Sequence, residues 1–205
     1  TGNKARHQMA GFPLNAIDKY IQVLIRNGYT IVIIDQDSNG KKGKTRSVKK
    51  IISPGTNIDY WENADSNWSL CIFMDQITND QIFIGMALCD ITTGETKVFE
   101  IYSDISDKLY GLDEVYRFIQ IHCPSEIVIY MNNMDYMTDT EIITYFEIEG
   151  CINHIKREYK KDYTNPVYQE QFLQKVYKNK TMLSIVNYLE LDRYQYALNA
   201  FIVLL

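Results

Sequence analysis

The order of short apolar segments between residues 67 and 158 constrains the fold of this chain most strongly. The first three have the length and composition of β-strands, and only the polar turns QITND and TTGE separate them. Turns of this length join antiparallel strands. Two more strand-like segments each follow a stretch with helical spacing, and a strand reached through a helix pairs in parallel. The predicted strands are residues 67–75, 81–91, 96–102, 126–131 and 151–158.

Two helices are predicted between these strands. The first covers about residues 106–122. The second starts with a T-x-x-E capping box, formed by Thr138 and Glu141, and ends at Gly150. The inward face of the first helix would consist of Leu109, Leu112, Val115 and Ile119. The order β-β-β-α-β-α-β defines an α/β domain with a mixed sheet flanked by helices, and it is the order of a ribonuclease H-like domain.

Residues 1–60 are predicted to form a smaller mixed α/β segment. A helix over 13–28 is followed by a buried strand over 29–35 and then by a polar loop that contains glycine. A second strand over 46–53 is closed by a Pro-Gly turn. The inward face of the helix would consist of Leu14, Ile17, Ile21, Leu24 and Ile25.

A polar linker and a helical tail complete the predicted organisation. The domain boundaries are 1–60, 66–165 and 166–205, and the last segment is expected to be helical. Helical spacing of apolar residues continues to Leu205 without a stop signal, as in a piece of a longer protein.

Composition indicates a globular protein of a reducing, intracellular compartment. Hydrophobic residues make up 46% of the chain and charged residues 23%, and the formal net charge of −5 leaves room for a local basic patch. The four cysteines lie far apart without a C-x-x-C pair, which favours reduced thiols. The three histidines lack metal-ligand spacing, so no metal site is predicted. No apolar run reaches the roughly 18 residues that a membrane span needs.

The stretch SNGKKGKT resembles a phosphate-binding loop but fails its requirements. Ser38 stands where the first glycine belongs. The segment after Thr45 is short, β-branched and closed by proline, so it cannot supply the helix whose N-terminus holds the phosphates. The sequence therefore predicts no nucleotide site here.

A metal-dependent nuclease would suit the predicted sheet, since clustered carboxylates on adjacent strands hold two divalent metals. The available acids are Asp75 and Asp90, with Glu126 at the beginning of the fourth strand. Asp90 opens the tight turn DITTGE, where an aspartate bonds the backbone in any case. A structural role for these acids is favoured, and the nuclease using Asp75 and Asp90 stays an alternative.

A cluster of basic residues between positions 41 and 50 is the remaining candidate site. On a hairpin it would line up against a phosphate backbone and release condensed counterions. Lysines also keep an exposed edge strand soluble, and the cluster would suit that role equally well. Composition does not distinguish DNA binding from this structural role. The cluster consists of Lys41, Lys42, Lys44, Arg46, Lys49 and Lys50.

Four segments, in order, resemble the MutS family of DNA mismatch repair proteins. They are MAGFPLNAIDKYIQVLIRNGYTIVIIDQ, KTRSVKKIISPGT, GMALCDITTGE and YALNAFIVLL. The resemblance covers nearly the full chain. It identifies 1–60 as the last part of the mismatch-binding domain, 66–165 as the connector domain and 166–205 as the opening of the core or lever region. The motif positions with structural roles would be Gly11, Pro13, Pro54, Gly55, Asp90 and Gly94.

The resemblance implies a DNA contact at Arg46, which stands where the family's R-x-V arginine faces the DNA backbone. The neighbouring lysines would then contact the DNA backbone and position the protein on it, without recognising the base sequence. The connector would be ribonuclease H-like without a metal site and would offer a surface to other mismatch repair proteins. A protein–protein interaction module with negligible DNA binding is a further alternative.

Two family features are missing from this chain. The F-x-E motif that reads the mismatch has no counterpart before Gly11, and the ATPase phosphate-binding loop is absent. We therefore expect no catalysis and no cofactor in this fragment, with ATP and Mg²⁺ bound only elsewhere in the parent protein. Its expected partners are double-stranded DNA and other repair proteins, the parent is expected to be a homodimer or oligomer, and no membrane is involved.

Overall fold

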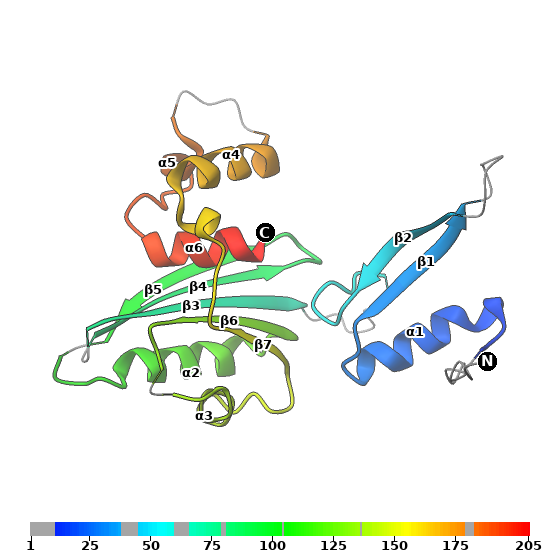
Figure 1. Ribbon diagram of the computed structural model, residues 1–205, viewed down its shortest axis with the longest axis horizontal. Helices are drawn as coiled ribbons and strands as arrows, with labels where there is room; N and C mark the ends of the chain where they lie inside the picture. Colours follow the sequence, from blue (N-terminus) through cyan, green and yellow to red (C-terminus); the bar gives the residue numbers. More distant parts are fainter. Residues whose placement is uncertain are drawn as a thin grey trace, which may run out of the picture. The chain divides into compact units, whose positions relative to one another are not determined.

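The computed structural model divides into two compact units, Thr1–Tyr60 and Trp61–Leu205, each considered by itself (Figure 1). The residues that the structure describes are 11–37, 45–59, 66–78, 81–103, 105–135, 137–178 and 183–205.

The first unit is a helix packed on a two-stranded antiparallel sheet. Helix α1 spans Ile17–Arg26, and strands β1 (Ile31–Asp37) and β2 (Thr45–Ile52) pair with each other. Its small core contains Ile21, Ile25 and Ile52, with Ile17, Ile31 and Ile33 partly buried against them.

The start of the predicted helix is different in the structure. A 3₁₀ turn, η1 (Leu14–Ala16), precedes α1, so the side chain of Leu14 is 83% exposed instead of lying in the core. Leu24, also expected inside, is exposed as well. The predicted end is confirmed: Gly28 has a φ of 80° and the Tyr29 amide bonds the Leu24 carbonyl, which is a glycine-dependent helix stop.

The second unit contains a five-stranded mixed sheet in the order β5-β4-β3-β6-β7. The β3–β4 and β4–β5 pairs are antiparallel, whereas β3–β6 and β6–β7 are parallel. The first three strands of the sheet are thus antiparallel and the last two pair in parallel, as the turns and helices predict. The α/β fold class is confirmed. The strands are β3 (Trp68–Thr78), β4 (Gln81–Asp90), β5 (Thr96–Tyr102), β6 (Glu126–Asn132) and β7 (Ile152–Lys156).

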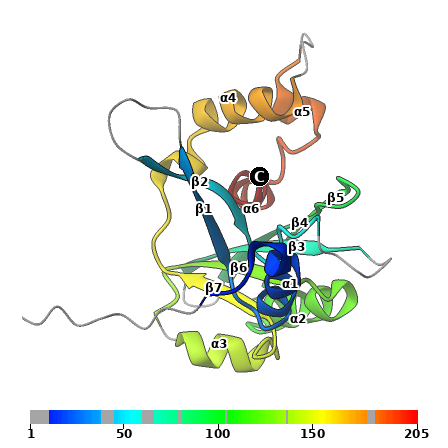
Figure 2. The same ribbon diagram turned by 90° about the vertical axis from the view of Figure 1, so that its right-hand side faces the viewer.

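Helices cover both faces of this sheet (Figures 1 and 2). Helices α2 (Tyr110–His122) and α3 (Asp139–Tyr145) lie on one face, against Leu70, Ile72 and other apolar side chains of the strands. The other face, with Cys71 and Phe73, is covered by the C-terminal helices. Burial on both faces explains the nearly continuous apolar strands. The C-terminal helices are η2 (Lys161–Thr164), α4 (Pro166–Tyr177), α5 (Ile185–Tyr188) and α6 (Gln195–Leu204).

Three helix boundaries differ from the prediction. Helix α2 begins at Tyr110, so Leu109 precedes it and is 49% exposed. The capping box of Thr138 and Glu141 is present, but α3 ends at Tyr145 because Glu147 adopts a left-handed conformation with a φ of 54°. The tail is not one helix: Lys178, with a φ of 48°, ends α4 in the same way.

Helix α6 packs closely on strand β4 at Gly85. A Cβ atom added to Gly85 would lie 1.9 Å from the Tyr196 carbonyl carbon and 2.2 Å from the Ala197 nitrogen. Beside Gly85, in register on β5, Glu100 accepts hydrogen bonds from the backbone amides of Tyr196 (2.7 Å) and Ala197 (2.9 Å). A strand carboxylate thus satisfies the first amides of α6, which have no partner within the helix.

The cysteines agree with the prediction of reduced thiols. All four are free, and Cys71 is completely buried, which raises the pKa of its thiol. Among the described residues, no helix combines the length and apolar character that crossing a bilayer requires.

Candidate nucleic-acid interface

The hairpin of β1 and β2 carries the described part of the basic cluster. Its register pairs Ile33 with Lys50 and Ile34 with Val48, so Lys49 is one extra residue in β2. Such a β-bulge bends the strand and changes which face the following side chains occupy. Beyond the bulge, Gln36 pairs with Arg46 near the end of the ladder.

The bulge separates the basic residues between the two faces of the hairpin. Directly paired residues share a face, and neighbours along a strand alternate. Ile33 faces α1, so its partner Lys50 lies on the same face of the hairpin. Gln36 lies three residues further along β1 and therefore on the opposite face, which it shares with its partner Arg46. The prediction that the basic residues line up along the hairpin is therefore wrong for Arg46 and Lys50.

Apart from Arg46 and its partner Gln36, the paired residues on this open face are apolar. The face carries Val32, Ile34, Val48 and Ile51, whose side chains are 50% to 59% exposed. Sequence analysis missed this surface because four β-branched residues in two strands are equally typical of a buried sheet.

The three described basic residues also differ in their partners. Lys49 pairs with Asp35 at 3.2 Å, and Lys50 pairs with Asp59. Hydrogen bonds from the Gln36 amide and from Lys49 lower the pKa of Asp35, so that this partner stays charged. Arg46 is exposed, and none of the described acidic residues pairs with it. Arg46 is thus an exposed arginine near the end of the hairpin without a described acidic partner.

The remaining predicted contacts, Lys41, Lys42 and Lys44, lie outside the described residues. The segment directly after them is a strand. Strand β2 begins at Thr45, so no helix N-terminus directly follows the GKT sequence.

The family motif residues in this unit lie outside its α-helix and strands. Pro13 precedes the 3₁₀ turn, and Gly11 has open space where a side chain would be. After β2, the Ser53 amide bonds the Thr56 hydroxyl at 2.8 Å and the Thr56 amide bonds the Ser53 carbonyl at 3.1 Å. Pro54 and Gly55 are buried within this turn.

The nuclease alternative fails on distance. Asp75 pairs with Phe83 at one end of the β3–β4 hairpin, whereas Asp90 pairs with Trp68 at the other end. Seven residues of strand separate the two positions along β3, which is about 23 Å. Two metals of a nuclease site lie only about 4 Å apart. Asp75 is also engaged by the amide groups of Asn132 and Asn133, at 2.9 and 3.0 Å.

Asp90 instead organises the turn between β4 and β5. One carboxylate oxygen accepts from the amide and hydroxyl of Thr92, at 2.9 and 2.6 Å, and from the Asn67 amide at 3.1 Å. The other accepts from the Thr93 hydroxyl at 2.8 Å, and Gly94, with a φ of 76°, closes the turn. Burial raises the pKa of Asp90, but these hydrogen bonds outweigh burial and lower the pKa below its usual value. The described residues contain no cluster of three metal-ligating side chains.

Comparison with known proteins identifies the chain. Residues 1–60 match the family model for MutS domain I. A MutS homologue of Acanthamoeba polyphaga mimivirus is 31% identical over 159 residues, which is 74% of this chain and 14% of that protein. The DNA mismatch repair protein MutS of Caldanaerobacter subterraneus is 27% identical over 180 residues, or 85% of this chain and 19% of that protein. The MutS protein of Clostridium tetani is 30% identical over 79% of this chain and 17% of that protein.

The chain is a member of the MutS family, as its motifs predict. It spans 14% to 19% of the length of these relatives. Among solved structures, human endonuclease V aligns with 78% of this chain and 68% of its own at 9% identity, with a TM-score of 0.33. At that score the similarity carries no information about function.

Proposed function

We propose that this chain is the part of a MutS-like mismatch repair protein that contacts the backbone of double-stranded DNA through the β1–β2 hairpin. The single observation that supports this proposal most is the exposed guanidinium of Arg46, which no described acid neutralises and which occupies the family's R-x-V position. A guanidinium is suited to phosphate because its fork of donors matches two phosphate oxygens.

The ion pairs of Lys49 and Lys50 do not prevent their participation. All four side chains of these pairs are at least 47% exposed, and exposed pairs contribute only about 0–1 kcal/mol. A DNA phosphate would therefore replace Asp35 or Asp59 as the partner of its lysine at a small cost in free energy. We propose that Arg46 is the primary contact and that Lys49 and Lys50 contribute electrostatic attraction.

The other activities of the parent are assigned to segments outside this chain. ATP and Mg²⁺ would bind there, because the GKT sequence is followed by a strand. Mismatch recognition also belongs elsewhere, since no F-x-E motif precedes the helix. In this chain, binding is expected to be independent of a mismatch.

Charge reversal of Arg46 provides the test. The wild-type chain should bind a fluorescein-labelled DNA duplex weakly, and its affinity should fall steeply as the salt concentration rises. Each phosphate that the protein neutralises contributes about −0.9 to the slope of log K against the logarithm of the salt concentration. Arg46→Glu should lower the affinity at low salt at least about tenfold and reduce the slope by about 1 or more. Fluorescence anisotropy between 25 and 200 mM salt, about the range in which such contacts are resolved, measures both.

Lys175→Glu, the same charge reversal on an exposed position of α4, is the matched control and should leave the slope near the wild-type value. If Arg46→Glu and Lys175→Glu weaken binding equally, the effect is one of net charge and Arg46 is not a specific contact. If the wild-type chain shows no duplex binding even at low salt, the interaction-module alternative replaces this proposal.

A further inference from the structure

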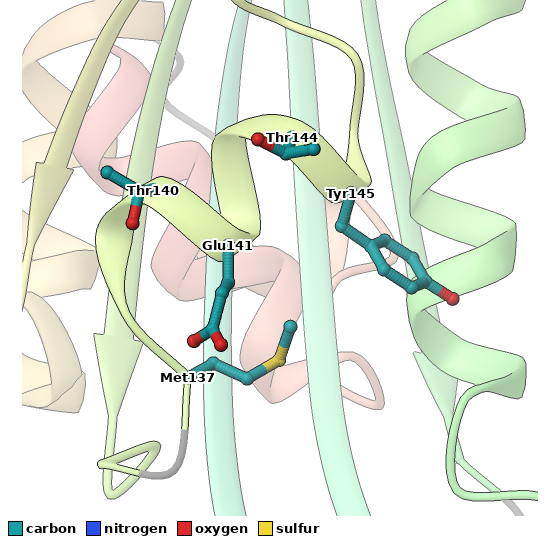
Figure 3. A pocket seen from close by; sticks show the side chains of 5 residues that line it. All are labelled: Met137, Thr140, Glu141, Thr144 and Tyr145. Atoms are coloured by element: carbon teal, nitrogen blue, oxygen red, sulfur yellow. The ribbon is translucent and has the colours of Figure 1, made fainter.

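A shallow cavity of about 490 Å³ lies on the exposed side of α3, in the second unit (Figure 3). Its described lining consists of Met137, Thr140, Glu141, Thr144 and Tyr145. The Glu141 carboxylate and the Met137 side chain extend to the same side of α3, and the Tyr145 ring points towards α2 (Figure 3). The surface of the cavity is mostly apolar, although most of its residues are exposed.

The cavity has a fixed shape because two tyrosines join α2 to the α3 region. The Tyr145 hydroxyl donates to Asp113 of α2, and in the opposite direction the Tyr116 hydroxyl of α2 donates to Glu147 at 3.0 Å. Burial and the carboxylates of Asp113 and Asp107 raise the pKa of Tyr145 to about 12, so its hydroxyl remains a donor. The ring that forms one wall is therefore held in place.

The charged groups around the cavity are mainly acidic. The guanidinium of Arg157, which donates to the Met137 carbonyl at 2.6 Å, is paired with the Asp139 carboxylate at 2.7 Å. Glu141 lines it, and hydrogen bonds from the Thr138 amide and hydroxyl lower the pKa of Glu141, so that it is ionised at neutral pH. Beyond the Tyr145 hydroxyl lie Asp113 and Asp107. None of the five described lining residues is basic.

We propose that this cavity accepts a lysine or arginine side chain presented by a partner protein. An apolar stem would lie on the Met137 thioether and the Tyr145 ring, and the cationic head would be attracted to Glu141 and, across the tyrosine, to Asp113. Long basic side chains bury their methylenes on apolar surface and keep the charge at a polar rim, which is the combination present here. Methionine adapts its shape to either side chain. This inference concerns a different surface from the hairpin and does not depend on DNA binding.

The test uses three tripeptides that differ only in the central residue. Acetyl-Gly-Arg-Gly-amide, its citrulline analogue and its norleucine analogue are titrated into the ¹⁵N-labelled full chain, and amide shifts are followed by NMR. Citrulline has the shape of arginine without the charge. We expect saturable shifts at residues 137–145 with arginine and roughly three- to fivefold weaker binding of citrulline, as a partly exposed charge interaction provides.

The double variant Asp113→Asn, Glu141→Gln should remove the preference for arginine over citrulline. Both replacements keep the hydrogen-bond acceptors of Tyr145 and Thr138, so the cavity retains its walls. Asp192→Asn, at an exposed position elsewhere in the unit, is the matched control and should keep the preference.

Three outcomes would overturn the proposal. One is equal binding of arginine and citrulline peptides by the wild-type chain. A second is the absence of saturable shifts at residues 137–145. The third is binding of spermidine as tight as that of the arginine peptide, which would assign the cavity to a free polyamine instead of a protein side chain.

Discussion

Replacing Gly85 by alanine is expected to destabilise the second unit by about 3 kcal/mol or more, at the upper end of what overpacking costs. The added Cβ would lie 1.9 to 2.2 Å from backbone atoms of Tyr196 and Ala197, well inside van der Waals contact. A backbone cannot rotate away as a side chain can, so α6 would have to shift from the sheet. That shift would also lengthen the hydrogen bonds from these two amides to Glu100. Urea unfolding followed by circular dichroism measures the loss.

Gly150→Ala is the matched control for this prediction. Nothing lies within 4 Å of a Cβ built at Gly150, so its free energy of unfolding should stay within about 0.5 kcal/mol of the wild-type value. An unfolding midpoint for Gly85→Ala close to that of Gly150→Ala would mean that α6 does not pack on β4 as described.

Replacing Asp90 by alanine should cost about 3 kcal/mol. Asp90 is 1% exposed, and its removal would take away the acceptor of the Asn67 amide, which belongs to a fully buried residue, and of the Thr92 amide in the exposed turn. Asp90→Asn should cost less, because its side-chain oxygen can still accept from one or more of these donors. The loss is measured as the change in the urea midpoint at pH 7.

The Asp90 carboxylate should also make stability depend on pH. Its pKa is lower in the folded chain than in the unfolded chain, so its contribution is complete above the unfolded pKa of about 3.9 and disappears as the pH falls through the folded pKa. Between pH 6 and pH 2, roughly the range of carboxyl titration, wild-type chain should lose more stability than Asp90→Asn, which retains every other carboxyl group. Equal losses in the two proteins would show that Asp90 does not titrate as described.

Local sequence patterns predicted the elements of the second unit well because each is controlled by neighbouring residues. The tight turns after β3 and β4 determine antiparallel pairing, and the Thr138–Glu141 capping box starts α3 at the predicted residue. Helix ends were predicted less accurately. Leu109 has the helical spacing of α2 but lies before its first turn, and Glu147 stops α3 in a conformation that is unusual for glutamate.

The family and the order of strands and helices could be predicted from the sequence, since both depend on motifs and patterns of residues close together in the chain. The three-dimensional structure was needed to place Arg46 and Lys50 on opposite faces of the hairpin, because one extra residue at Lys49 exchanges the faces. It also decided the roles of Gly85 and Glu100, which contact a helix about a hundred residues further along. Contacts between such distant residues depend on the packing of whole elements, and no local pattern encodes them.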